Sequence, residues 1–409
     1  MHTIPLSALK KPTPPKIRKV QVIFKTVERC NLACTYCYYY FHGDDSANGR
    51  PAVVSRELFP AIVDFIATGA RDLGLEEMDI IFHGGEPTLQ KPRDFAYLCD
   101  LIRERIDPVC PVSLGMQTNA VHLSDEWLDC LRRYGVGVGI SLDGPAEYHD
   151  RFRLDRKGRG SHAQVEANLR RLQAARQQGE LPSVGCISVV NSAFSARRIF
   201  DYLTDEMGLS ALGFLLPDRS WDTPFDNGDS ALAYGEFLKE LFDAWLLRQD
   251  VRVRELNDLL DFLQLRRNED MPRPPEPDSV RNQILVIQSD GTISVDDSLI
   301  PTLEWRHKFP SPHISQTSMR DFFSLPGFAE IAQARHTLPQ GCSDCVWKKP
   351  CHGGSLENRY SRESGFDNPS VYCDGLKSFY RHVADTLIDN GYPRELMAQK
   401  LGVEPARLS

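Results

Sequence analysis

Short apolar runs alternate with helix-like segments along the first half of the chain, and this alternation restricts the fold more than any other feature. Six runs have the length and composition of buried strands: Val20–Thr26, Met78–Phe82, Val112–Gln117, Val136–Leu142, Ser183–Val190 and Leu212–Leu216. Five amphipathic segments lie between them: Ser55–Thr68, Pro92–Ile106, Ser124–Tyr134, Ser161–Gln177 and Ser195–Met207. Strands that alternate with helices pair in parallel through right-handed crossovers. Because six strands are too few for a closed eight-stranded barrel, we expect an α/β fold with an open, partial (β/α)6 barrel.

The second half of the chain is organised differently. Helices are expected over Ala231–Arg248 and Val253–Arg266, followed by a segment with four prolines. Two apolar runs then flank Asp290-Gly291, which is a strong hairpin signal, and a helix is expected over Leu376–Asp389. We therefore expect a flexible lead-in over residues 1–19, the partial barrel over 20–230, a helical bridge and Pro-rich linker over 231–280, a small Cys-rich domain over 281–390 and a tail over 391–409.

Composition excludes several classes of partner. The chain has 409 residues, and its net charge of −8 gives no basic field that would attract nucleic acid or an anionic membrane. No stretch approaches the roughly 18 consecutive apolar residues that a membrane span needs. The Pro- and Lys-rich start of the chain lacks the apolar centre of a secretory signal. We therefore expect a cytoplasmic protein with no nucleic-acid and no membrane partner.

The cysteines fall into two tight groups. Eleven cysteines, an odd number, in a long chain without an export signal argue against a disulfide framework. Four stand singly in apolar contexts and are expected as small buried side chains: Cys99, Cys110, Cys130 and Cys186. The other seven lie near the end of the first expected strand and in the C-terminal region, and their spacing favours metal or cluster binding.

The first group, Cys30, Cys34 and Cys37, directly follows the first expected strand. Three thiolates can hold three irons of a cubane cluster and leave the fourth iron open to an outside molecule. A zinc site would need a fourth ligand, and the nearest candidate is His42, five residues further on. The spacing favours the open cluster and leaves zinc as the alternative.

This C-x3-C-x2-C spacing, with Tyr36 before the third cysteine, resembles the signature of the radical S-adenosylmethionine (SAM) superfamily. The resemblance implies a radical SAM partial barrel and a 4Fe–4S cluster whose open iron binds the amino and carboxylate groups of SAM. It also implies an enzyme that cleaves SAM reductively to a 5′-deoxyadenosyl radical. The cofactors supply this chemistry, and the protein positions and shields it.

The segment from His83 to Pro87 (HGGEP) ends the second expected strand and resembles the GGEP element of the same superfamily. Gly84 and Gly85 would let the backbone come close to the ligand. Glu86 would offer its carboxylate to the ammonium group of SAM. A simple strand-to-helix turn is the alternative for this segment taken alone.

Two more strand ends support the resemblance. Ser141 ends the fourth strand, and Arg153 follows twelve residues later, a separation found in peptide-modifying members and especially in anaerobic sulfatase-maturating enzymes. The resemblance implies that both contact the carboxylate of SAM, and an Arg fork suits a carboxylate. Gln117-Thr118-Asn119 resembles a polar strand-end element of the family. The expected SAM-binding residues are thus Tyr36, Gly84, Gly85, Glu86, Ser141 and Arg153.

The second group consists of Cys342, Cys345, Cys351 and Cys373. Four thiolates suit a closed zinc site or a fully ligated iron–sulfur cluster equally well. The run resembles the SPASM extension of peptide-modifying radical SAM enzymes, which implies that these four hold one auxiliary 4Fe–4S cluster.

Two other positions depart from the SPASM pattern. Ser355 and Asp296 stand where the pattern has cysteines of an inner cluster, so we expect two clusters in all and not three. Asp297 matches an acid/base residue of the sulfatase-maturating relatives. A solvated turn is the alternative for Asp296-Asp297.

Three stretches resemble SPASM enzymes that install three-residue cyclophanes in ribosomally made precursor peptides: Val22–Cys30, Cys37–Phe41 and Gly43–Ser46. The resemblance implies that the substrate is such a precursor peptide, joined by a C–C crosslink, and that a flavodoxin- or ferredoxin-type donor supplies electrons. The alternative is a formylglycine-forming sulfatase maturase or another SPASM peptide-modifying enzyme. A non-catalytic metal-binding scaffold for peptides is a more distant alternative.

Overall fold

A computed structural model describes residues 17–41, 46–223, 225, 229–248, 250–263, 265 and 282–408. In this part of the chain the strands form one nine-stranded sheet, in the order β7-β6-β5-β4-β3-β2-β1-β8-β9. The strands are β1 Lys19–Val27, β2 Glu77–Gly84, β3 Val112–Thr118, β4 Val136–Ser141, β5 Val184–Val189, β6 Ala211–Leu215, β7 Arg252–Val253, β8 Asn282–Ile287 and β9 Ile293–Ser294. Strands β1 to β6 pair in parallel and in chain order, which confirms the expected partial barrel.

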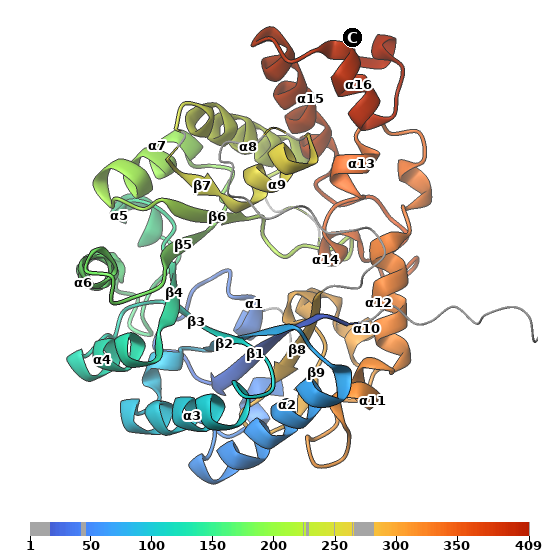
Figure 1. Ribbon diagram of the computed structural model, residues 1–409. Coiled ribbons are helices and arrows are strands. Elements are labelled where there is room, and N and C mark those ends of the chain that lie inside the picture. Colours follow the sequence, from blue (N-terminus) through green and yellow to red (C-terminus); the bar gives the residue numbers. More distant parts are fainter. Residues whose placement is uncertain are drawn as a thin grey trace, which may run out of the picture.

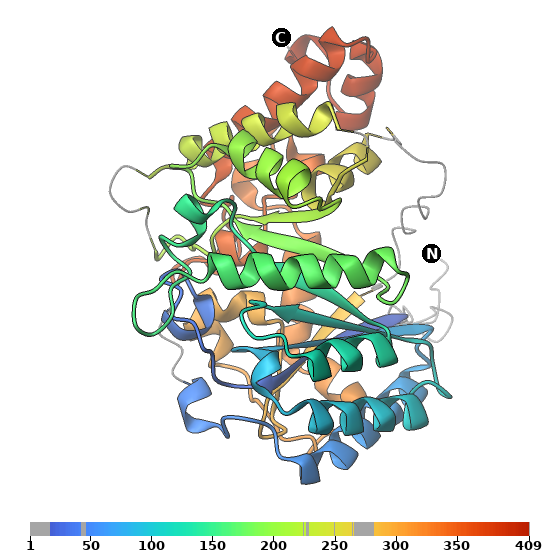
Figure 2. The same ribbon diagram turned by 90° about the vertical axis from the view of Figure 1, so that its left-hand side faces the viewer.

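The helices of the first half cover one face of the sheet. Figure 1 shows α3, α4, α6 and α7 along the outer, convex face of the curved sheet, and Figure 2 shows them side by side in front of the strands. The helices are α1 Tyr38–Phe41, α2 Phe59–Leu73, α3 Pro92–Arg105, α4 Asp125–Tyr134, α5 Ala146–His149, α6 His162–Gln177, α7 Ala196–Asp201, α8 Ala231–Leu246, α9 Arg254–Phe262, α10 Leu303–Arg306, α11 Met319–Phe323, α12 Pro326–His336, α13 Lys348–Cys351, α14 Leu356–Arg359, α15 Cys373–Asp389 and α16 Arg394–Leu401. The C-terminal region from α10 onward runs along the open side of the curved sheet, where α11 packs against α2 and α15 packs against α8.

Side chains of β1 point alternately to the two faces of the sheet, so this strand contributes both to the hydrophobic core and to the site. Val20, Val22 and Phe24 are fully buried and belong to the single large hydrophobic core of the described chain. Successive side chains of a strand point to opposite faces, so Lys25 points away from the face of Phe24. Lys25 lies directly opposite His83 of β2 in the parallel register. A buried cation and an imidazole thus meet on the inner face of the sheet.

Several expected helices differ from the observed ones at their ends. Ser124 and Ser195 cap α4 and α7 by accepting hydrogen bonds from Trp127 N–H and Arg198 N–H. Ser55 instead caps a short 3₁₀ turn, so α2 starts four residues later than expected. It ends at Leu73 and is capped by Gly74, whose φ is +61°. Helix α7 continues as one π-helical turn over Tyr202–Glu206.

The expected hairpin forms, but it is not a separate unit. Strands β8 and β9 pair antiparallel around Asp290-Gly291. Strand β8 also pairs in parallel with β1, so the C-terminal region extends the barrel sheet. Sequence patterns alone do not specify which strand edge a distant segment joins, because that choice depends on packing in three dimensions.

The C-terminal region packs on the barrel through a close helix crossing. Gly235 of α8 and Gly375 of α15 face each other so closely that a Cβ on Gly235 would lie 2.7 Å from the Gly375 Cα atom. Gly375 lies in the first turn of α15, which begins at Cys373. Part of the expected tail folds as α16, in which Met397 and Leu401 are buried.

Other expectations lie outside the described residues or stay untested. Most of the lead-in and the four-proline linker fall outside the described ranges, and the domain boundaries stay a prediction. None of the described helices combines the length and apolar character needed to cross a membrane.

Candidate active site

The first cysteine group lies on a loop that leaves β1 at the carboxyl end of the sheet. Gly85 N–H and Glu86 N–H donate hydrogen bonds to the carbonyl oxygens of Val27 and Arg29, at 2.7 and 2.9 Å. A Cβ on Gly84 would collide with the Val27 carbonyl, and one on Gly85 would collide with the Arg29 carbonyl and the Tyr40 hydroxyl. The two glycines are therefore required by the approach of the cysteine loop itself. Their expected role toward SAM stays a prediction.

A second segment, after β4, holds the cysteine loop from the other side. Ala33 N–H and Thr35 N–H donate to the carbonyls of Leu154 and Phe152, at 2.8 and 3.1 Å. Arg156 donates to the Cys30 carbonyl at 3.0 Å. The segment that carries Arg153 is thus fixed against the loop that carries the cysteines.

Arg153, Tyr36 and Asp143 form a buried group behind the cysteines. Arg153 donates to the Tyr36 hydroxyl at 2.7 Å, and this hydroxyl donates to Asp143. Arg153 is only 7% exposed, yet its Nε atom has no hydrogen-bond partner among the described residues. An unpaired, buried guanidinium N–H costs free energy unless a ligand accepts its hydrogen bond. This orphaned donor suits a carboxylate from an outside molecule.

Glu86 is fully buried and already holds several donors. Its Oε1 atom accepts from Thr88 N–H, Thr88 O–H and Thr118 O–H at 2.6–3.0 Å, and its Oε2 atom accepts from Asn119 N–H at 2.7 Å. A carboxylate oxygen can accept about two hydrogen bonds. Oε2 therefore retains capacity for one further donor, such as the ammonium group expected there.

A cavity of about 730 Å³ joins these elements. Its wall contains the three cysteines and each expected SAM-binding residue. These residues are Cys30, Cys34, Cys37, Tyr36, Gly84, Gly85, Glu86, Ser141 and Arg153. Tyr38, Tyr39 and Tyr40 also line it, so this aromatic run faces the cavity. The structure thus brings together all expected residues of the first site, although their roles stay predictions.

Asp297 lies beside this cavity, behind a layer of other side chains. Lys25, which is fully buried, donates to Asp297 and lies 3.2 Å from His83 Nδ1, and the Tyr38 hydroxyl donates to Asp297 at 3.0 Å. Burial acts to raise the pKa of Asp297, but Lys25 and Tyr38 outweigh it and hold this pKa well below its usual range. Tyr38 and His83 belong to the cavity wall and Asp297 does not, among the described residues. A strongly stabilised carboxylate is a weak base. The base role of Asp297 stays a prediction that this geometry does not favour.

The four C-terminal cysteines converge on one small cavity. Burial, and then the proximity of the Cys373, Cys342 and Cys345 thiols, raises the pKa of Cys351 to about 12. The four thiols thus share one cavity and act on one another's protonation. No three His, Cys, Asp or Glu side chains in the described ranges are arranged around a single metal ion.

The positions expected for an inner cluster hold other chemistry. Asp296 pairs with Arg335 at 3.2 Å and accepts from Ser298 N–H at 3.0 Å. Ser355 lines a separate cavity of about 450 Å³ together with Glu357 and Arg335. Asp296 and Ser355 thus place a carboxylate and a hydroxyl, with Arg335 beside them, at positions where the SPASM pattern has cysteine thiolates.

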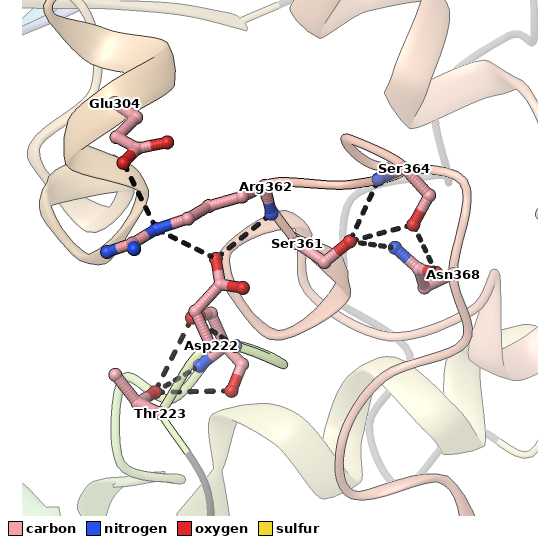
Figure 3. Close-up of polar contacts among 8 residues, drawn as sticks. Asp222, Thr223, Glu304, Ser361, Arg362, Ser364 and Asn368 are labelled. Carbon is pink, nitrogen blue, oxygen red and sulfur yellow. Dashed lines mark hydrogen bonds and ion pairs between the residues drawn. The ribbon is translucent and has the colours of Figure 1, made fainter.

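The loop after β6 lines the main cavity and is held by the C-terminal region. Figure 3 shows the Arg362 side chain reaching between Asp222 and Glu304, with its own backbone N–H donating to Asp222 at 3.0 Å. Trp221 N–H donates to the Tyr360 carbonyl at 2.9 Å. Asp218 and Asp222 of this loop line the cavity opposite the cysteines.

Sequence patterns missed four members of the site. Lys25 and His83 are single polar residues in strands, and only the register of β1 and β2 pairs them. Asp143 lies inside the expected strand-end motif, but its contact with Tyr36 depends on the loop path. Asp218 had one available signal, because it follows the end of β6, where open α/β folds place ligands.

Comparison with known protein families identifies the domain that carries this site. The family model of the radical SAM superfamily matches residues 24–187. This chain carries a radical SAM domain. The match spans the three cysteines and every expected SAM-binding residue.

The similar proteins include sulfatase-maturating enzymes. The chain is 24% identical over 366 residues to a cysteine-type anaerobic sulfatase-maturating enzyme of Clostridium perfringens, covering 88% of this chain and 95% of the relative. It is 24% identical to a serine-type anaerobic sulfatase-maturating enzyme of Bacteroides thetaiotaomicron, covering 91% of this chain and 90% of the relative.

Solved structures share the fold. The structure of native anSMEcpe with bound AdoMet and Cp18Cys peptide matches with a TM-score of 0.74 and 23% identity, covering 91% of this chain and 98% of that one. Streptococcus suis SuiB matches with a TM-score of 0.58 and 14% identity, covering 88% of this chain and 77% of that one.

Residues 24–187 thus form a radical SAM domain, and enzymes with this domain use a 4Fe–4S cluster and SAM. The residues present fit these groups. Three thiols share the cavity wall, the Arg153 Nε atom lacks an acceptor, and Glu86 Oε2 has room for a donor. The cluster and SAM supply a 5′-deoxyadenosyl radical when they are bound. The four C-terminal cysteines line one small cavity, and their role as ligands of an auxiliary cluster stays a prediction.

Proposed function

We propose that this radical SAM enzyme oxidises a side chain of a peptide or protein substrate, as its sulfatase-maturating relatives do. The observation that carries this proposal is the main cavity. Its wall, which encloses about 730 Å³, contains both the cysteine loop and the loop after β6. Oxidation of an unactivated C–H bond requires a substrate held close to the radical and away from water.

Formylglycine formation at a sulfatase cysteine or serine is the better supported reaction. Its support comes from relatives that extend over most of the chain, from the barrel through the second cysteine group. The printed description of anSMEcpe with a bound peptide supports a peptide substrate.

A three-residue cyclophane is the second candidate. It is supported by the local resemblance of the segments around Cys30 and the tyrosine run, whose side chains line the cavity. The loss of inner-cluster thiolates at Asp296 and Ser355 also separates this chain from the three-cluster SPASM pattern. A cytoplasmic location and an external flavodoxin- or ferredoxin-type donor remain part of the proposal.

The test uses anaerobically reconstituted enzyme with a chemical reductant and SAM. One arm receives synthetic sulfatase peptides in their cysteine and serine forms, and the other receives any short precursor peptide encoded beside the gene. Mass spectrometry with a hydrazide reagent separates the reactions, because formylglycine is an aldehyde and a C–C crosslink is not. A crosslink also suppresses fragmentation between the joined residues.

Two variants serve as controls for this test. Cys34→Ala removes one of the three expected cluster thiols and should abolish 5′-deoxyadenosine formation. Cys130→Ala removes a cysteine outside both groups and should leave it unchanged. Wild-type enzyme with both clusters loaded that forms 5′-deoxyadenosine but changes neither kind of peptide would contradict the proposed substrate class.

A further inference from the structure

The loop after β6 holds one carboxylate in an unusual situation. Asp218 lines the main cavity, on the wall that faces the cysteine loop. Among the described residues, none donates a hydrogen bond to its carboxylate. Its neighbour Asp222, by contrast, accepts from Arg362 N–H.

The backbone on both sides of Asp218 is fixed by the C-terminal region. The Tyr372 hydroxyl donates to the Pro217 carbonyl at 2.9 Å, and Asn358 Nδ2 donates to the Arg219 carbonyl at 2.8 Å. Both donors are buried. The protein therefore immobilises the residue while its side chain stays available to a ligand, as preorganised reactive groups require.

We propose that Asp218 is the acid/base residue of the reaction, and that its carboxylate takes the proton which the substrate releases on oxidation. This inference rests on the proposed function and moves the proton-accepting role from Asp297 to the cavity wall. Asp297 is already paired with Lys25 and Tyr38, whereas none of the residues that the structure describes donates a hydrogen bond to the Asp218 carboxylate.

The atoms and electrons balance as follows. The substrate loses two hydrogens in all. One leaves as a hydrogen atom and forms the new C–H bond of 5′-deoxyadenosine. The other leaves an S–H or O–H bond of the substrate, or an aromatic C–H bond in the crosslinking reaction, as a proton that forms an O–H bond on Asp218. Its electron passes to a one-electron acceptor of the iron–sulfur class, and the substrate gains a C=S or C=O bond, or a C–C bond in the crosslinking reaction.

The surroundings give Asp218 the proton affinity that this role needs. Burial, and then repulsion from Glu357, Asp297 and Asp296, raises the pKa of Asp218 to about 8. The hydroxyls of Tyr38 and Tyr372 also interact with it, and Arg219 is its chain neighbour. A general base works best when its pKa lies near the working pH. Because the charged form accepts the proton, product formation should rise with pH through about 8.

The test compares Asp218→Asn, Asp218→Glu and Asp297→Asn as fully reconstituted enzymes, with SAM and whichever peptide the wild-type enzyme modifies in the test of the proposed function. Asp218→Asn should still form 5′-deoxyadenosine but should lose product by about a hundredfold or more, and its pH dependence should disappear. Asp218→Glu should restore part of the product. Glu357→Gln, which removes a repelling carboxylate, should shift the wild-type pH profile to lower pH.

Product from Asp218→Asn at the wild-type rate and pH profile would overturn the inference. Loss of product in Asp297→Asn alone, with 5′-deoxyadenosine retained, would return the role to Asp297. Infrared spectroscopy gives a readout without substrate, so it separates this inference from the proposed function. The carbonyl band of a protonated carboxyl group should titrate near pH 8 in wild type and vanish in Asp218→Asn. Wild type without such a band would also overturn the inference.

Discussion

The buried pair of Lys25 and Asp297 offers a strong test of how the inner face of the sheet is built. Asp297→Asn keeps the shape of the side chain but removes its charge. Lys25 is 0% exposed, and among the described residues Asp297 is the carboxylate that pairs with it. His83 supplies no negative charge to pair with Lys25, and burial, and then Lys25, lowers the pKa of His83 to about 3, so its ring is neutral.

Removing one partner of a buried pair typically costs about 3–5 kcal/mol. Native domains are stable by only about 5–15 kcal/mol, so the variant should lose a large share of its stability. The folded pKa of Asp297 is depressed, so its contribution is fully present above about pH 4 and is lost as the pH falls through the folded pKa. Urea unfolding at neutral pH therefore measures it in full.

The assay compares the urea midpoints of wild type, Asp297→Asn and the double variant Lys25→Met/Asp297→Leu. The single variant should unfold at clearly lower urea with a similar slope. The double variant should recover most of the loss, because well-packed apolar residues can replace a buried pair at little cost. A single variant within about 1 kcal/mol of wild type would refute the reasoning, because Lys25 would then not depend on Asp297.

Two further predictions concern the clusters. Gly85→Ala should prevent assembly of the first cluster, because the added Cβ collides with the Arg29 carbonyl and the Tyr40 hydroxyl, and iron should fall to about four per chain. Gly49→Ala is the matched control, since no atom lies within 4 Å of its added Cβ, and its iron should equal that of wild type. Wild-type protein should contain about eight iron atoms per chain, for two cubanes of four. A value near twelve would mean that an inner cluster forms without cysteines at Asp296 and Ser355.

The sequence predicted the parts of the fold that depend on local periodicity. Strands β1 to β6 and their order follow from runs such as Val112–Gln117 alternating with amphipathic segments, and most observed bounds agree within one or two residues. The parallel addition of β8 to β1 was not predictable, because strand pairing over such a distance depends on tertiary packing. The π-helical turn after α7 carries no sequence signature that we used.

Prediction of the site succeeded where residues are grouped in motifs. Cys30, Cys34 and Cys37 and the strand-end segments all reach one cavity, since the carboxyl ends of parallel strands meet at one edge. Lys25 and Asp218 stand alone in the sequence, so their importance becomes visible only through register and loop packing. The glycines of the HGGEP segment were assigned to ligand approach, whereas the structure shows that the cysteine loop already requires them.

The central claim is that the cluster on Cys30, Cys34 and Cys37 keeps one iron open for SAM. Electron paramagnetic resonance of the anaerobic, reduced protein tests it directly, before and after SAM is added. We predict that SAM changes the spectrum of this cluster, because its amino and carboxylate groups become ligands of the open iron. A spectrum that stays the same at saturating SAM, in protein with both clusters loaded, would contradict the account.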